Sequence, residues 1–245
     1  MKLFLSFTLW SGVALLCAVV AGANAFAYVV DSTGDGDRVA CINGVCDTSG
    51  TTCNDGTNHC TLRAAIESAN LHAGTDTISF NIPTTDPGFS NGVWTITLVN
   101  GSLPDITSAV SISGPGAARL VVNGKNGNFQ FRVFNVTTNG TISFSGITIL
   151  KGAIDTTHGG GGAIQNVNGG TVNITNCTLR ENGATQGSTT QASTGGAIYN
   201  PSGTVNVTNS TLSSNYASTF EVGGSADGGA IYNGTGTIHV SNSTF

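Results

Sequence analysis

The stretch Gly162-Ala163-Ile164-Gln165-Asn166 returns twice further along the chain, as Gly196-Ala197-Ile198-Tyr199-Asn200 and as Gly229-Ala230-Ile231-Tyr232-Asn233. Each copy is followed by a segment in which polar and apolar residues alternate. Its first residue is Thr171, Thr204 or Thr237, which gives a period of 33 residues twice. Self-similarity at such a period is typical of arrays in which every repeat packs on its neighbours.

Ankyrin and tetratricopeptide arrays have a similar period, but they need two amphipathic helices per repeat. Here the apolar residues recur at every second position, as Val172 and Ile174 do, and again Val205 and Val207. The repeats are also rich in Gly, Asn and β-branched residues, which disfavour helix and favour strand. The pattern therefore predicts an all-β protein, a right-handed parallel β-helix (solenoid) with two or three strands per repeat.

An older copy of the repeat lies upstream. Val133-Phe134 and the segment 141–144 keep the internal spacing of the later copies. We therefore expect the β-helix to span 76–245, with repeats of about 33 residues from about residue 130. The chain stops at Phe245, at the start of the third strand of a repeat, so we expect the C-terminus to be truncated.

The N-terminus has the features of a secretory signal peptide. Lys2 precedes an apolar stretch at 3–20, and Ala23-Asn24-Ala25 is a small-x-small cleavage site. We expect a signal peptide at 1–25, cleaved after Ala25, although an uncleaved membrane anchor is an alternative. No later apolar run approaches the ~20 residues that span a bilayer, so the mature chain should have no transmembrane span and lie outside the cell or on a bacterial surface or outer membrane.

Composition excludes one class of partner. Only 9% of the residues are charged, and the formal net charge is −5. A protein that binds nucleic acid usually carries a basic patch, so we expect no nucleic-acid partner.

The segment 26–75 is predicted to be an N-terminal cap module. Its helix, 61–70, places Leu62, Ala65, Ile66 and Ala69 on one face, with Thr61 as N-cap. That face can cover the open end of the solenoid core. We expect Arg63 and Glu67 to face water, with an ion pair or a clamp on backbone carbonyls as the alternative for Arg63.

Four cysteines crowd into this module: Cys41, Cys46, Cys53 and Cys60. In an oxidising compartment they predict two disulfides with three possible connectivities. A zinc site is the alternative, but the spacing lacks close Cys pairs. Cys177 lies far from the other cysteines and aligns with Ser210 and Ser243. We therefore expect Cys177 to be a small residue in a ladder, a column of equivalent side chains from successive coils, rather than a nucleophile.

An acidic loop precedes the cysteines. Asp31, Asp35 and Asp37 alternate with Gly and Ser, as oxygen ligands do in calcium loops. A structural Ca²⁺ held by these three residues is a possible cofactor; the alternative is a solvated turn. We expect no other cofactor.

Several motifs resemble a bacterial family, the C-S-L-R-E-A domain of secreted β-helix proteins. They are 44–48, 60–70, 74–78 and the G-G-A-I-Y-N repeat, which also resembles polymorphic outer-membrane proteins. Thr61 stands in place of the family's Ser and Ala64 in place of its Glu. The resemblance implies a surface or secreted β-helix protein and a Cys46–Cys60 disulfide, which leaves Cys41 to pair with Cys53.

Parallel β-helices also include pectate lyases and glycoside hydrolases, whose chemistry needs converging carboxylates. From Val133 onward the acids are Asp155, Glu181, Glu221 and Asp227, and no two of them share a repeat offset. Lys151 and Asp155 are the charged residues that come closest to forming a catalytic pair. We therefore expect no catalytic residues and a non-enzymatic adhesion or ligand-binding scaffold, with a polysaccharide-cleaving enzyme as the alternative. Surface glycans or host and cell-surface proteins are the expected partners, and the recurring Tyr199 and Tyr232 could stack on sugars or pack as a ladder.

Overall fold

Alternating apolar side chains build the longest wall of the molecule. In β12 (Thr141–Ser145), β16 (Thr171–Thr175) and β21 (Thr204–Thr208) the second and fourth side chains are buried, and the others reach the surface. The computed structural model describes residues 25–39, 41–42, 45–46, 52–126, 129–154, 160–186, 192–219 and 224–245.

The sequence repeat is the register of this wall. Thr171 lies opposite Thr204, and Thr204 lies opposite Thr237, so each coil takes up 33 residues. The preceding coil along the chain is shorter, because Thr141 lies opposite Thr171 at a separation of 30 residues. The older repeat copy predicted from the sequence is therefore confirmed.

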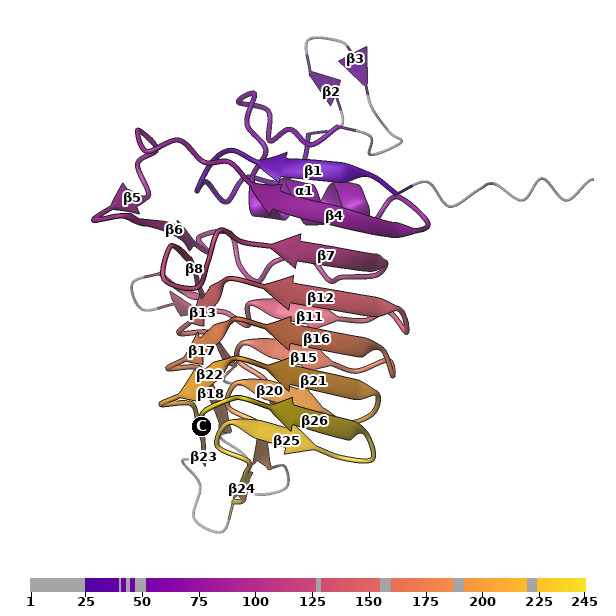
Figure 1. Cartoon of the computed structure of the whole chain (residues 1–245), viewed down its shortest axis with the longest axis vertical. Helices are drawn as coiled ribbons and strands as arrows, with labels where there is room; N and C mark the ends of the chain where they lie inside the picture. Colours follow the sequence, from indigo (N-terminus) through magenta and orange to yellow (C-terminus); the bar gives the residue numbers. More distant parts are fainter. Residues whose placement is uncertain are drawn as a thin grey trace, which may run out of the picture.

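Successive coils form parallel sheets that follow the long axis (Figure 1). The first sheet contains β1 (Ala27–Val30), β4 (Thr75–Phe80), β7 (Ala109–Ser113), β12, β16, β21 and β26 (Thr237–Ser241). The second contains β6 (Val93–Thr97), β8 (Leu120–Asn123), β13 (Thr148–Leu150), β17 (Thr178–Arg180) and β22 (Thr211–Ser213), with β5 (Phe89–Ser90) antiparallel at its edge. The third contains β11 (Phe134–Val136), β15 (Ile164–Asn166), β20 (Ile198–Asn200) and β25 (Ile231–Asn233). The chain is a right-handed parallel β-helix, as the sequence predicts.

Shorter strands complete each coil. They are β14 (Ala153–Ile154), β18 (Gly183–Gln186) and β23 (Tyr216–Thr219) in one sheet, and β19 (Ser193–Thr194) with β24 (Ala226–Asp227) in another. Two small antiparallel pairs lie outside these sheets: β2 (Cys41–Ile42) with β3 (Val45–Cys46), and β9 (Lys125–Asn126) with β10 (Phe129–Gln130). A described coil such as β15 to β19 thus has more strands than the two or three expected, because polar turns divide it into short pieces.

One of these turns depends on asparagine. Asn176, Asn209 and Asn242 follow the first sheet in successive coils and have φ angles of 54°, 50° and 48°; Gly146 takes the place one coil earlier, with φ of 61°. Asparagine tolerates the left-handed region better than most residues. The repeated Asn is therefore required by the backbone.

The glycine before the repeated Gly-Ala-Ile is equally constrained. Gly161, Gly195 and Gly228 have φ angles of 78°, 58° and 64°, and an added Cβ would lie 2.3, 2.0 and 2.2 Å from the carbonyl oxygen of an Ile three residues on. No other residue fits this close approach.

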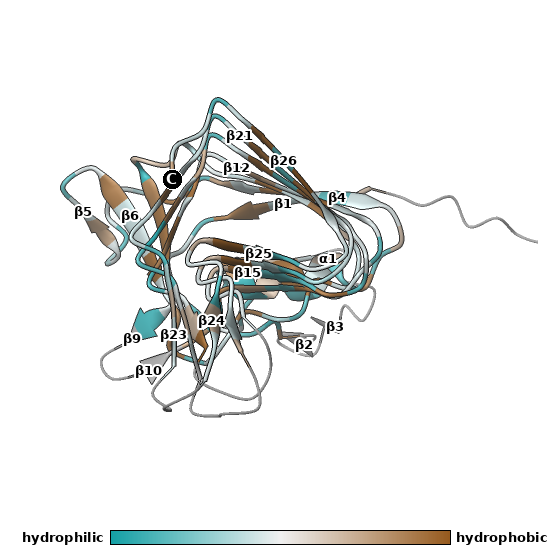
Figure 2. Cartoon of the chain, turned by 90° about the horizontal axis from the view of Figure 1, so that it is seen from below, coloured by the Kyte–Doolittle hydropathy of each residue, from teal (hydrophilic) through white to brown (hydrophobic). Residues whose placement is uncertain are grey.

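Figure 2 shows the walls of the solenoid in cross-section. Stacked apolar side chains fill the space between these walls. Phe134, Phe144 and Ile149 are buried in one continuous core with their copies in the next two coils, which are Ile164, Ile174, Leu179, Ile198, Val207 and Leu212. In the last coil the copies are less buried, since Val240 is 46% exposed. Burial of each such side chain stabilises the fold by about 1.5–3 kcal/mol.

Helix α1 (Leu62–Ala69) lies across the N-terminal end of this core, beside β1 and β4 (Figure 1). Leu62, Ala65, Ile66 and Ala69 belong to the same buried cluster as the solenoid interior. The Thr61 hydroxyl accepts a hydrogen bond from Ala64 N at 3.1 Å, so Thr61 is the predicted N-cap. Within the described residues, no helix is long and apolar enough to cross a bilayer. Residues 1–24, most of the predicted signal peptide, are outside the described part.

Candidate functional site

Arg63 is buried rather than solvated. Its side chain projects from α1, and the residue is only 4% exposed. Its Nε lies 2.8 Å from Asp35 Oδ1 and its Nη2 lies 3.1 Å from Asp35 Oδ2. It also donates to the carbonyl oxygens of Gly101 and Ser102, at 2.9 and 2.8 Å. The expectation that Arg63 faces water is therefore wrong, and the alternative, an ion pair with a carbonyl clamp, is confirmed.

Asp35 receives further donors, which explains how its charge is tolerated without solvent. The amide nitrogens of Val99 and Asn100 donate to Oδ2 at 2.7 and 2.9 Å. Buried charges need such paired and hydrogen-bonded surroundings. The network ties the loop before the cysteines, the cap helix and the loop after β6 into one unit.

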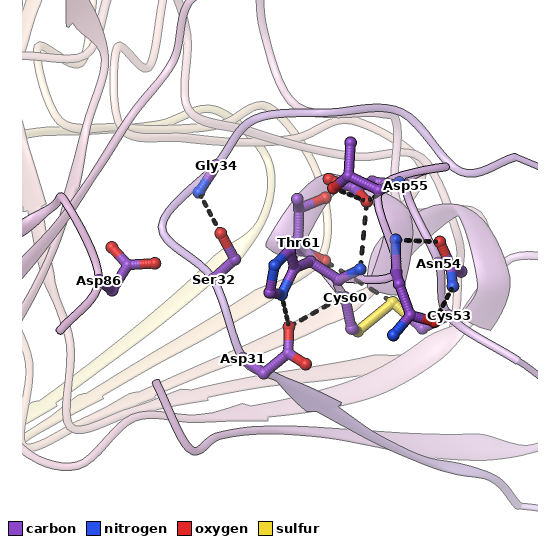
Figure 3. Close-up of polar contacts among 12 residues, drawn as sticks. Asp31, Ser32, Gly34, Cys53, Asn54, Asp55, Cys60, Thr61 and Asp86 are labelled. Atoms are coloured by element: carbon purple, nitrogen blue, oxygen red, sulfur yellow. Dashed lines mark hydrogen bonds and ion pairs between the residues drawn. A yellow bond between two sulfur atoms is a disulfide. The ribbon is translucent and has the colours of Figure 1, made fainter. Parts of the chain in front are cut away.

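The three residues of the predicted calcium site have separate surroundings. Asp31 accepts from Cys60 N at 2.8 Å and lies 3.4 Å from the His59 ring (Figure 3). Asp37 is largely exposed, 3.5 Å from Arg63. No group of three His, Cys, Asp or Glu side chains among the described residues is arranged to hold a metal ion. Since Arg63 already occupies the position beside Asp35 that a cation would need, calcium binding here stays a prediction without support.

The disulfide connectivity differs from the one that the family resemblance implies. Cys53 is bonded to Cys60, directly before α1 (Figure 3). Cys60 therefore does not pair with Cys46. Cys41 and Cys46 lie opposite each other in the β2–β3 register, and their side chains are outside the described residues. The Cys53–Cys60 bond closes a short loop beside the cap, which sequence spacing alone could not select.

Carboxylates near the cap accept hydrogen bonds, from the same loop at Asp55 and from distant segments at Asp86 and Glu67. Burial tends to raise the pKa of Asp55, but hydrogen bonds from the Thr57 hydroxyl and amide and from the His59 amide outweigh it and lower that pKa (Figure 3). Asp86 behaves in the same way: Thr33 and Gly88 donate to it, and its pKa is lowered despite burial. Glu67 differs, because burial and then Asp37 raise its pKa against the amide of Arg38. These contacts account for the acids of the cap as structural groups.

The acids of the repeats do not form a described catalytic pair. Glu181 bonds to Arg180 and lies 3.5 Å from Lys151. The side chain of Asp227 is exposed on β24. Asp155 and Glu221 are outside the described residues, so the Lys151–Asp155 pair is not tested.

Tyr199 and Tyr232 form a ladder. Their rings stack 5.3 Å apart at an interplanar angle of 15°. Burial, and then Tyr232, raise the pKa of Tyr199. The ladder interpretation is confirmed, while sugar binding to these rings remains a prediction.

Cys177 is buried in another ladder. The Ser210 hydroxyl accepts from Cys177 N at 3.1 Å, and the Ser243 hydroxyl accepts from Ser210 N at 3.1 Å. Burial raises the pKa of the Cys177 thiol. The prediction of a structural rather than nucleophilic role agrees with this environment.

A small surface pocket lies near the N-terminal end of the solenoid and is lined by residues of β4, β6 and β8. Its volume is about 110 Å³. It is lined by Phe80, Asn81, Ile82, Trp94, Pro115, Arg119 and Leu120. Trp94 is half-buried, and the Arg119 guanidinium carbon lies 5.5 Å from the centre of its indole ring. The indole, the guanidinium and the amide together make this pocket a candidate binding site.

A β-hairpin holds Trp94 in place. Asn91 and Gly92 form its two-residue loop between the paired residues Ser90 and Val93, with φ angles of 51° and 84°. Phe89 packs against Trp94 with ring centres 4.9 Å apart, and Trp94 Nε1 donates to Pro83 O at 3.2 Å. No motif considered from the sequence predicted this site. The Asn-Gly pair between β-type residues is the hairpin signal that could have indicated it.

The described architecture defines a parallel β-solenoid protein with a helical cap and a small aromatic pocket. No protein-family profile matches the chain, and no curated protein or solved structure shows significant similarity to it.

Proposed function

We propose that this chain is an exported or surface-displayed scaffold that binds acidic glycans and does not cleave them. The observation that carries the proposal is the pocket of Trp94 and Arg119. Family membership in the C-S-L-R-E-A group and a surface location are part of the same proposal, and they rest on the sequence motifs.

The chemistry of the pocket suits a sugar acid. An indole offers an apolar face, Arg119 offers bidentate donors for a carboxylate or sulfate, and Asn81 offers an amide. Arg119 is exposed and forms no ion pair with another described residue, so its charge is available to a ligand. In a chain of net charge −5 this local cation favours an anionic ligand.

The size of the pocket indicates how the ligand sits. About 110 Å³ is below the roughly 300–1,000 Å³ of sites that enclose a small molecule. The pocket therefore holds one group of a longer molecule, such as the carboxylate end of one sugar in a polysaccharide. The rest of that polysaccharide can lie along the outside of the coils.

The test is a binding assay of the mature chain, residues 26–245, on a panel of uronate-containing, sialylated, sulfated and neutral glycans. We expect binding to acidic members. Arg119→Ala should lose about tenfold or more in affinity, since a charge-assisted hydrogen bond contributes about 1.5–3 kcal/mol. Trp94→Ala should also weaken binding, because it removes the apolar face of the pocket.

Lys125→Ala is the matched control, because it removes an exposed cation outside the pocket. Equal affinity of Arg119→Ala and Lys125→Ala would reject the pocket. Binding of proteins but of no glycan would reject the ligand class.

A further inference from the structure

Asp76 is a buried carboxylate with an incomplete set of partners. It is the second residue of β4 and is 0% exposed. The backbone nitrogen of Phe26 donates to Asp76 Oδ1 at 2.7 Å. Oδ2 is buried and has no hydrogen-bond partner. A carboxylate in this position is costly unless a cation and further donors reach it.

The other groups around Asp76 do not supply a hydrogen bond to its Oδ2 atom. His72 Nδ1 is 3.9 Å from Asp76 Oδ2, and the same nitrogen is 2.9 Å from the Tyr28 hydroxyl. His72 Nε2 is also buried without a partner. The Phe26 ring stacks on the His72 ring at 3.9 Å and so covers the site. Apart from His72, no described cationic side chain forms an ion pair with Asp76.

The nitrogen that does reach Asp76 is the one that signal-peptide cleavage would free. Phe26 follows Ala23-Asn24-Ala25, the predicted cleavage site. In the uncleaved chain this nitrogen is an amide with one N–H and no charge. Hydrolysis of the Ala25–Phe26 bond consumes one water: hydroxyl goes to the Ala25 carbonyl carbon, and the Phe26 nitrogen becomes an amine. Protonation then gives an ammonium with three N–H donors.

We propose that cleavage after Ala25 creates the missing partner of Asp76, so that the mature N-terminal ammonium of Phe26 forms a buried ion pair with this carboxylate. The ammonium supplies the positive charge and enough donors for both carboxylate oxygens. This inference rests on the export that belongs to the proposed function.

The ion pair has a structural consequence for the cap. Phe26 directly precedes β1, which pairs with β4 alone in the first sheet. Asp76 belongs to β4, so the pair fixes the start of β1 against β4, next to α1. Processing of the chain thereby completes the cap after export.

The first test compares two proteins that differ in their N-terminal residue, each with and without the Asp76 carboxylate. One protein begins at Phe26, and the other carries one additional alanine, Ala25, so that its charge lies one residue away. Each is made with Asp76 and with Asp76→Asn. We expect a Tm at least about 5 °C higher for the Phe26 start with Asp76, and no difference between starts with Asp76→Asn. Equal Tm values with Asp76, or the same difference in both backgrounds, would overturn the proposal.

The second test needs no change at Asp76 and stays informative if that variant does not fold. Both starts are treated with 2-pyridinecarboxaldehyde, which modifies free α-amines. We expect the Phe26 start to react at least about tenfold more slowly than the Ala25 start while folded, and at the same rate in denaturant. Equal rates in the folded proteins would contradict a buried ion pair.

N-terminal sequencing of the protein exported by a bacterial host separates this inference from the proposed function. A first residue of Phe26 supports the inference. Processing at another residue overturns it, and glycan binding by the same sample then shows that the proposed function stands. Retention of the intact leader inside the cell contradicts export itself.

Discussion

Arg63 makes the strongest prediction at the scale of single residues. Replacing it with Met removes the guanidinium and leaves Asp35 buried with only two amide donors. Removal of one partner of a buried pair typically costs about 3–5 kcal/mol. We expect Arg63→Met to lower the free energy of unfolding by about that amount, measured by urea denaturation followed by circular dichroism.

Arg119→Met is the matched control, because Arg119 is exposed and outside the cap network. Its effect should stay within about 0.5 kcal/mol. If both variants unfold at the same urea concentration, the Arg63–Asp35 pair does not stabilise the cap.

Cys177 makes a second prediction at this scale. Its raised pKa keeps the thiol protonated at pH 8, and the thiolate is the reactive form. Burial also blocks access. We expect iodoacetamide at pH 8 to leave Cys177 unmodified in the folded protein and to label it fully in denaturant, as measured by mass spectrometry. Rapid labelling of the folded protein would show that the ladder position is open.

Single residues were predictable where the repeat constrained them. The alignment of Cys177 with Ser210 and Ser243 matches the observed register. The environment of Arg63 was not predictable, because its partner Asp35 and the carbonyls after β6 approach it only in the folded cap. Nothing in the local sequence distinguishes a buried arginine on α1 from a solvated one.

At the scale of elements, the disulfide beside α1 can be checked by peptide mapping. Digestion of the unreduced chain before each Asp separates 37–46, 47–54 and 55–75. We expect 47–54 to be linked to 55–75 through Cys53 and Cys60. A link from 37–46 to 55–75 would instead support the connectivity implied by the family resemblance.

Closing so short a loop stabilises by about 2–3 kcal/mol, so Cys53→Ser should weaken the cap by a similar amount.

Elements differed in how well the sequence predicted them. Helix α1 and its N-cap at Thr61 agree with the apolar spacing, because one face of a short helix must meet the core. The expected two or three strands per coil were too few, since Asn and Gly turns divide the walls into shorter pieces. Strand β5 was not predicted, because it adds an antiparallel edge to the second sheet and its residues match no copy of the repeat.

At the scale of the whole molecule, the β-helix follows from a sequence period that places equivalent residues of successive coils next to each other. Asn200 Nδ2 donates to Asn233 Oδ1 at 2.6 Å, and Asn166 Nδ2 donates to Asn200 Oδ1 at 2.9 Å. Such ladders and the shared core hold the coils together, so the sequence could predict the architecture. It could not predict the pocket, which is assembled from three unique strands at the N-terminal end.

We propose that this scaffold binds acidic glycans at Trp94 and Arg119 without cleaving them. The most direct measurement follows one acidic polysaccharide that the mature chain retains, with and without Ca²⁺, for reducing ends and unsaturated products. We predict retention that is weakened by Arg119→Ala, and no new ends above a sample without protein. New ends that disappear on substitution of Asp227 or Asp155 would contradict the account and make the protein a polysaccharide-cleaving enzyme.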